Sequence, residues 1–144
     1  MTPLSLVATV VLVATGAVFW FVLHWYLNPR LKHPDGHARF TGSCGDTMEL
    51  ELMFNNQKVE DFYYWTDGCS ISKMCLATAA MLARGKTVPE LIKIDKSAIL
   101  KEVGNLPDTH IHCAILAEIV LQMAVEDYAA ARESKQNNHQ EKSI

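Results

Sequence analysis

Residues 48–65, MELELMFNNQKVEDFYYW, decide the fold of this chain. In the first half, apolar residues alternate with Glu49 and Glu51, and this period of two predicts a strand with one buried face and carboxylates facing water. Residues 55–57, NNQ, are typical of a turn, and the second half is rich in β-forming residues, so the stretch predicts an antiparallel hairpin. The preceding segment 37–42, HARFTG, can add a third strand.

The composition becomes helical after the hairpin. Residues 70–84, SISKMCLATAAMLAR, are rich in Ala, Leu and Met, and Gly85 follows where a helix C-cap favours a left-handed residue. Two short helices are predicted at 89–94 and 96–103, before a last long helix. The apolar face of that last helix, which we expect to cover the sheet, contains Ile115, Ile119, Val120, Met123 and Tyr128. Strands followed by helices predict an α+β fold, a three-stranded antiparallel sheet covered by helices on one face.

An apolar segment precedes this domain. Residues 4–23, LSLVATVVLVATGAVFWFVL, carry no charge, and as a helix they would span roughly 30 Å, the thickness of a bilayer's hydrocarbon core. Pro29 should end the helix. Arg30 and Lys32 follow it and no basic residue precedes it, which predicts a single-pass membrane anchor with the N-terminus outside and the domain in the cytoplasm. A cleaved secretory signal, which would need a basic start and a small-residue cleavage site, and a buried core helix are the alternatives.

Composition divides the chain of 144 residues into four parts. We expect a transmembrane anchor at 1–27, a juxtamembrane linker at 28–38, one domain at 39–130, and a solvated, disordered polar tail at 131–144. The formal net charge of -3 offers no basic stripe for phosphates, which excludes nucleic acid as a partner.

Four cysteines in a domain on the reducing side of a membrane predict free thiols. Cys75 lies within an apolar helix and fits a small buried hydrophobe. Cys44 lies between two glycines, and Asp46 follows it by two residues. Cys69 and Cys113 lie near the starts of predicted helices, where unpaired backbone N–H groups favour a thiolate, so we expect both to be reactive.

His112 adds a nitrogen donor, or a general base, beside Cys113. Three thiolates with Asp46 or His112 would suit tetrahedral iron or zinc. The cysteines are far apart in the sequence, unlike the CxxC pairs of zinc fingers, so the residues alone leave open a metal site and separately buried thiols. A zinc hydrolase with Asp46 or His112 as base is a further alternative, although no helix-borne zinc motif is present.

A series of motifs runs through the chain in a specific order: YLNPR, PDG, GSCGDTMEL, DGCSIS, LARGKT, LPDTHIHC, LAE and EDY. On these motifs the chain from residue 26 to about residue 130 resembles the NifU-like, IscU-type iron-sulfur scaffold family. The resemblance implies a three-stranded sheet with helices on one face and a cluster site at one exposed end. The positions that match the family's cluster ligands are Cys44, Asp46, Cys69 and Cys113, and His112 matches the histidine beside the last cysteine.

The resemblance implies a scaffold rather than an enzyme. Such a protein accepts persulfide sulfur from a cysteine desulfurase, here on Cys113, combines it with iron in a transient 2Fe-2S cluster, and passes the cluster to recipient apo-proteins. Asp46 would be the replaceable ligand, whereas ligation by four cysteines would favour retention and electron transfer. Zinc can occupy the same residues. The family's LPPVKLHC is changed at Asp108, Thr109 and His110, which argues against transfer assisted by an Hsp70-type chaperone.

Two other functions remain open from the sequence. One is a membrane-tethered 2Fe-2S electron-transfer protein, and the other is a zinc-binding protein that relays sulfur without building clusters. The predicted anchor departs from the family, whose usual members are soluble, and it predicts service to membrane-bound iron-sulfur enzymes.

Overall fold

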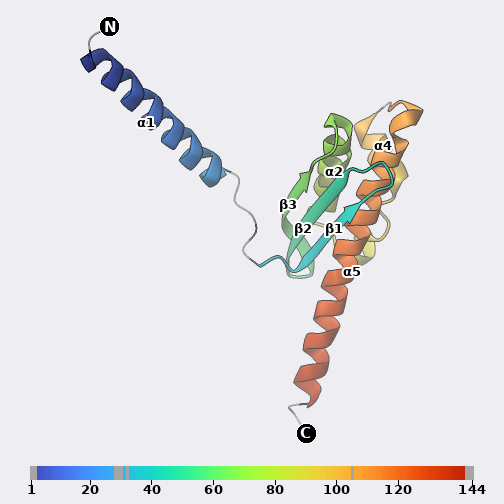
Figure 1. The fold of residues 1–144 in the computed structure, drawn as a ribbon. Coiled ribbons are helices and arrows are strands. Elements are labelled where there is room, and N and C mark those ends of the chain that lie inside the picture. Colours follow the sequence, from blue (N-terminus) through green and yellow to red (C-terminus); the bar gives the residue numbers. More distant parts are fainter. Residues whose placement is uncertain (1–2, 28–30, 32, 105, 142–144) are drawn as a thin grey trace. The chain divides into compact units, whose positions relative to one another are not determined.

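A computed structural model describes residues 3–27, 31, 33–104 and 106–141. It divides into two compact units, residues 1–30 and residues 31–144, which are treated separately below. The first unit contains α1 (Pro3–Leu27), and the second contains the sheet and the remaining helices (Figure 1).

The sheet has three antiparallel strands in the order β1 (Gly36–Thr41), β2 (Thr47–Asn55) and β3 (Lys58–Thr66). Asn56 and Gln57 connect β2 to β3 with φ angles of 50° and 66°. Two consecutive residues with positive φ make a turn of type I′, whose twist matches that of the flanking strands. The predicted three-stranded antiparallel sheet is therefore confirmed.

The helices follow the strands, as predicted. Their bounds are α2 (Ser70–Ala83), α3 (Val88–Leu91), α4 (Lys96–Val103), a 3-10 turn η1 (Asp108–His110) and α5 (Ile111–Glu141). The predicted cap of α4 is present, because the Asp95 carboxylate accepts a hydrogen bond of 2.9 Å from the Ala98 N–H. Gly85, just after α2, has a φ of 74°. Figure 1 shows α2, α4 and α5 on one side of the sheet.

The core lies between that side of the sheet and the helices. Met48, Leu50 and Leu52 of β2 are fully buried there. The facing side of α5 is lined by mostly small residues: Cys113, Ala114, Ala117, Val120, Leu121 and Ala124.

The predicted inner face of α5 is wrong in part. Val120 is buried, but Ile115, Ile119 and Met123 are each 37% exposed. The alanines let the helix backbone approach the sheet closely, so that a Cβ added to Gly36 would collide with a carbonyl oxygen of α5. Ile115, Ile119 and Met123 consequently lie toward the outer side of the helix, whereas the predicted Tyr128 stacks on Phe54 of β2.

The regular structure begins before, and continues beyond, the domain boundaries that the sequence predicted. The predicted linker at 28–38 is too long, because residues 36–38 pair with β2. The predicted disorder of 131–144 is wrong for residues 131–141, which continue α5. Extending an existing helix needs no new nucleus, and Ala, Arg, Glu, Lys and Gln all favour it.

Two carboxylates lie on the predicted outer face of β2 but are more buried than the sequence indicated. Glu49 and Glu51 are only 5% and 7% exposed, although among the described residues the helices from α2 to α5 lie on the other side of the sheet. The sheet register sets them between side chains of the two neighbouring strands, which are His37 and Arg39 on β1 and Tyr63 and Trp65 on β3. The Arg39 guanidinium reaches across β2 and lies 5.2 Å from the centre of the Trp65 ring.

The helix of the first unit has the length and composition needed to cross a membrane. Within it, Thr9–Tyr26 has a mean hydropathy of 1.6 and no buried residue. A signal sequence near an N-terminus has the same properties. The predicted helix end at Pro29 and the basic residues Arg30 and Lys32 lie outside the described residues.

Candidate cluster-binding site

The loop between β1 and β2 carries Cys44 and Asp46. The Gly42 N–H donates to the Asp46 carbonyl over 2.9 Å, and the Gly45 N–H donates to the Gly42 carbonyl over 3.0 Å. Gly45 has a φ of 89°, where a side chain would be strained. The loop is thus closed on itself by backbone hydrogen bonds.

This loop is tied to the segment that leads into α2. The Thr47 N–H donates to the Asp67 carboxylate over 2.6 Å, and the Thr66 hydroxyl donates to the Thr47 carbonyl over 2.7 Å. The Gly68 N–H in turn donates to the Thr66 hydroxyl over 3.1 Å. These three hydrogen bonds therefore hold the Asp46 loop against the start of α2.

Gly68 leaves the space that the Asp46 carboxylate occupies. A Cβ at this position would lie 2.5 Å from Asp46 Oδ2 and 2.8 Å from Ser72 Cβ. Both separations are far below van der Waals contact, so a larger residue would displace the carboxylate or α2.

Ser72 lies at the centre of the site. Ligand atoms of Asp46, Cys69 and Cys113, from three separate segments, lie within 4.8 Å of one another. The fully buried Ser72 hydroxyl donates to the Asp46 carboxylate, and its oxygen lies 3.3 Å from Cys113 Sγ and 3.6 Å from Cys69 Sγ. One hydroxyl has one hydrogen to donate, so it serves the carboxylate or a sulfur at any moment.

The two sulfurs of this group differ in environment. Cys69 is exposed at the N-cap of α2, and the backbone N–H of Ser72, followed by its hydroxyl, lowers the pKa of the Cys69 thiol. Cys113 is 1% exposed, and burial raises the pKa of its thiol even though Ser72 acts in the opposite direction. The lowered pKa agrees in direction with the thiolate expected at Cys69, whereas Cys113 enters the core and its raised pKa has the opposite direction; the reactivity of both thiols stays a prediction.

The remaining predicted residues are not members of this group, although Cys44 is near enough to Cys113 to contribute to the raised pKa of that thiol. Cys44 and His112 are exposed, and among the described residues neither joins the set of ligand atoms within 4.8 Å. The His112 ring lies edge-on to His110, with 6.2 Å between ring centres. Cys75 is fully buried, as its apolar helix predicts, and burial raises the pKa of its thiol to about 11.

The donor set of the group suits a thiophilic cation. Two sulfurs and a carboxylate oxygen match the preferences of iron and zinc, which bind such atoms at about 2.0 to 2.3 Å. Sequence reasoning missed Ser72. Its place three residues after Cys69, in the first turn of a helix, is the signal that could have revealed it, because a group there faces the N-cap side chain.

The comparisons with known proteins agree with this fold. Residues 22–135 match the NifU-like N terminal domain family. The chain belongs to this family.

Three curated relatives are named as iron-sulfur cluster assembly scaffold proteins. IscU of Azotobacter vinelandii is 36% identical over 118 residues, covering 74% of this chain and 90% of the relative. IscU of Escherichia coli is 32% identical over 123 residues, covering 79% of this chain and 95% of the relative. IscU 1 of Archaeoglobus fulgidus is 34% identical over 112 residues, covering 74% of this chain and 73% of the relative.

A solved structure supports the fold alone. The crystal structure of a SUF-system protein from Fervidobacterium islandicum AW-1 superimposes with a TM-score of 0.52 at 20% identity, covering 66% of this chain and 83% of that one.

Proposed function

We propose that this chain is a scaffold on which iron-sulfur clusters are assembled and from which they are transferred. Family membership and the named function of its relatives support the proposal. The observation that carries it is the meeting of Asp46, Cys69 and Cys113 around one buried hydroxyl. A scaffold is consumed and restored at each transfer, so it acts as a carrier and not as a catalyst.

The ligands we propose for the cluster are Cys44, Asp46, Cys69 and Cys113. Cys44 is exposed on a loop, so it can approach the other three with little loss of packing. His112 is the alternative fourth ligand when a single iron or zinc ion is bound. The carboxylate of Asp46 is the weakest of these donors for iron in a cluster, which favours release of a transient 2Fe-2S cluster over its retention.

A cysteine desulfurase is the proposed sulfur donor. In the transfer, an acceptor thiolate attacks the outer sulfur of the desulfurase persulfide, and the desulfurase cysteine leaves as a thiolate. Cys69 is exposed and has a lowered pKa, so it is ready for this attack. Acceptance by Cys113, the family's acceptor position, requires its buried sulfur to become accessible when the partner binds.

We also propose that α1 anchors the scaffold in a membrane, with the N-terminus outside and the domain in the cytoplasm. The apolar, unburied span Thr9–Tyr26 supports this, and the role would be delivery of clusters to membrane-bound apo-proteins. An intact N-terminus on membrane-extracted protein, determined by mass spectrometry, is the expected result. A mature chain that begins after α1 would show a cleaved signal instead.

Anaerobic reconstitution of the intact chain in detergent tests the scaffold function, with ferrous iron, cysteine, a desulfurase, and dithiothreitol as the two-electron reductant that turns persulfide sulfur into sulfide. We expect the visible absorption of a cluster in wild type, its loss in Cys113→Ser, and a cluster that forms but transfers slowly to an apo-ferredoxin in Asp46→Ala. Cys75→Ala is the control for loss of a buried thiol outside the site. Equal cluster yields from Cys113→Ser and Cys75→Ala would contradict the assignment, and a wild-type cluster that resists chelators would favour electron transfer.

A further inference from the structure

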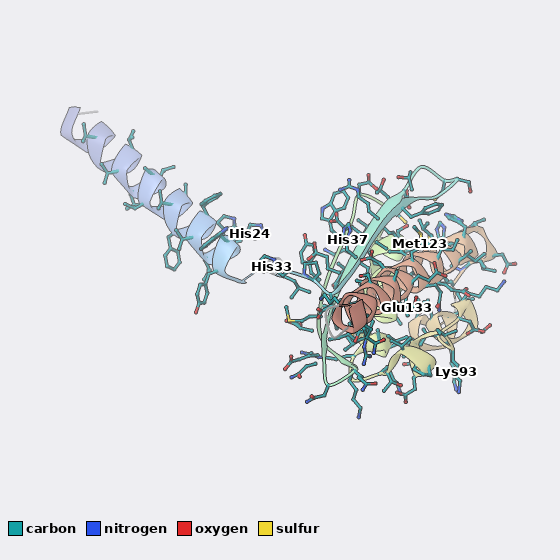
Figure 2. The ribbon with its side chains drawn as sticks, turned by 90° about the horizontal axis from the view of Figure 1, so that it is seen from below. His24, His33, His37, Lys93, Met123 and Glu133 are labelled. Atoms are coloured by element: carbon teal, nitrogen blue, oxygen red, sulfur yellow. The ribbon has the colours of Figure 1, made fainter. Side chains whose placement is uncertain are left out.

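The face of the sheet opposite the helices carries a second group of metal-binding side chains. One ligand atom each of His37, Glu49 and Glu51 lies within 4.8 Å of the others. His37 on β1 pairs with Glu51 on β2, and Glu49 lies two residues before Glu51 on β2. All three side chains therefore point to one face of the sheet. In Figure 2, His37 lies on β1 on the side away from α5.

Glu51 has a buried oxygen that finds no hydrogen-bond partner among the described residues. The residue is 7% exposed, and no donor from that part of the chain reaches Oε2. An unpaired carboxylate in such a place is costly, unless a cation or a proton compensates for the lost water.

The nearby nitrogen groups of His37 and Arg39 contact the other carboxylate. His37 Nε2 lies 3.2 Å from Glu49 Oε1, and Arg39 Nη1 lies 3.2 Å from Glu49 Oε2. Among the described residues, the Glu49 carboxylate therefore has two nitrogen partners, whereas Glu51 Oε2 has none.

We propose that His37, Glu49 and Glu51 bind one divalent transition-metal cation, such as Mn²⁺, Fe²⁺ or Zn²⁺. Two carboxylates and an imidazole form a common ligand set for these ions, with bonds of about 2.0 to 2.2 Å. The cation would supply the missing partner of Glu51 Oε2 and neutralise the pair of glutamates. Arg39 would remain hydrogen-bonded to Glu49 and orient it from the second coordination shell.

This site is separate from the cysteine site in place and in chemistry. Leu50, which lies between the two glutamates in the sequence, points to the opposite face and is fully buried in the core. Oxygen and nitrogen donors accept Mn²⁺, whereas thiolates select zinc and iron-sulfur clusters. Mn²⁺ therefore distinguishes the two sites, and the proposal does not depend on the scaffold function.

Titration of the intact chain in detergent with Mn²⁺ alone tests the proposal, because the six-line EPR signal of free Mn²⁺ disappears on binding. We expect one Mn²⁺ per chain in wild type and a loss of affinity of at least about tenfold in Glu51→Gln. Glu60→Gln removes the same charge from an exposed position on β3 and should bind as wild type does. Cys69→Ser should also bind as wild type does, because sulfur takes no part.

The melting temperature provides a second measurement that is independent of affinity. Mn²⁺ should raise it in wild type and in Glu60→Gln but not in Glu51→Gln. Without metal, Glu51→Gln should be at least as stable as wild type, because it removes an uncompensated buried charge. Absence of Mn²⁺ binding by wild type, or binding that is lost in Cys69→Ser and kept in Glu51→Gln, would overturn the proposal.

Discussion

Replacing Ser72 by alanine tests how the cysteine site is organised. The hydroxyl is fully buried and contacts the Asp46 carboxylate and both sulfurs of the group. Alanine keeps the Cβ that packs beside Gly68 and removes only the oxygen. The change therefore isolates the hydrogen bonds from the packing.

The expected loss of stability follows from the partner's charge and exposure. A hydrogen bond to a charged group contributes about 1.5 to 3 kcal/mol, and because Asp46 is only half-buried, water replaces part of it. We expect a loss of about 1.5 kcal/mol in the free energy of unfolding, which shifts a urea midpoint by about 1 M.

The thiol chemistry should change in the same variant. The Ser72 backbone N–H, which alanine keeps, and then the Ser72 side chain lower the pKa of the Cys69 thiol. Removing the hydroxyl should therefore raise that pKa in part and slow the alkylation of Cys69 by iodoacetamide at neutral pH. Ser70→Ala, at an exposed position in the same helical turn, is the matched control. An unchanged alkylation profile for Ser72→Ala, or an equal change in Ser70→Ala, would refute the central role of this hydroxyl.

Three further changes are predicted. Gly68→Ala should lower the free energy of unfolding by about 1 to 3 kcal/mol, because the new Cβ displaces the Asp46 carboxylate. The same variant should bind Co²⁺ more weakly at the cysteines, and an unchanged sulfur-to-cobalt absorption would contradict this. The Cys75 thiol has a pKa of about 11 in the fold against 9.0 when unfolded, so the stability that it contributes is complete below pH 9 and is lost as pH rises toward 11. Urea unfolding at these pH values should show a smaller loss in Cys75→Ala. Leu50→Ala should destabilise the domain by about 3 kcal/mol in urea, and a loss below 1 kcal/mol would show that β2 is not central to the core.

The sequence predicted the sheet because its signals are local. Alternation along β2 and the turn at Asn56 and Gln57 involve neighbouring residues, and both are present in the structure. The same was true of the Asp95 cap on α4. These features depend on backbone geometry that a short segment fixes by itself.

Burial was predicted less well because it depends on neighbours from distant segments. The largest apolar residues of α5 suggested the wrong inner face, since close approach to the sheet selected alanine there and left Ile115 and Met123 outside. Alternation gave Glu49 and Glu51 the correct side of the sheet, but flanking side chains from β1 and β3 remove them from water. The burial of Cys113 was missed in the same way, and it raises the pKa of a thiol for which the position near a helix start had indicated a thiolate.

One sulfur of the cysteine site is exposed and the other is buried, and this difference suits a carrier. A site made only of buried thiols would hold metal tightly but admit it slowly, whereas a fully exposed site would lose its cargo to water. Here Cys69 is exposed with a lowered pKa, and Cys113 is enclosed with a raised one. Ser72 lies between them and can donate its single hydrogen to the Asp46 carboxylate when the site is empty. Because the hydroxyl has one hydrogen, the Asp46 carboxylate and the Cys113 sulfur compete for it, so Ser72 couples two of the candidate ligands directly.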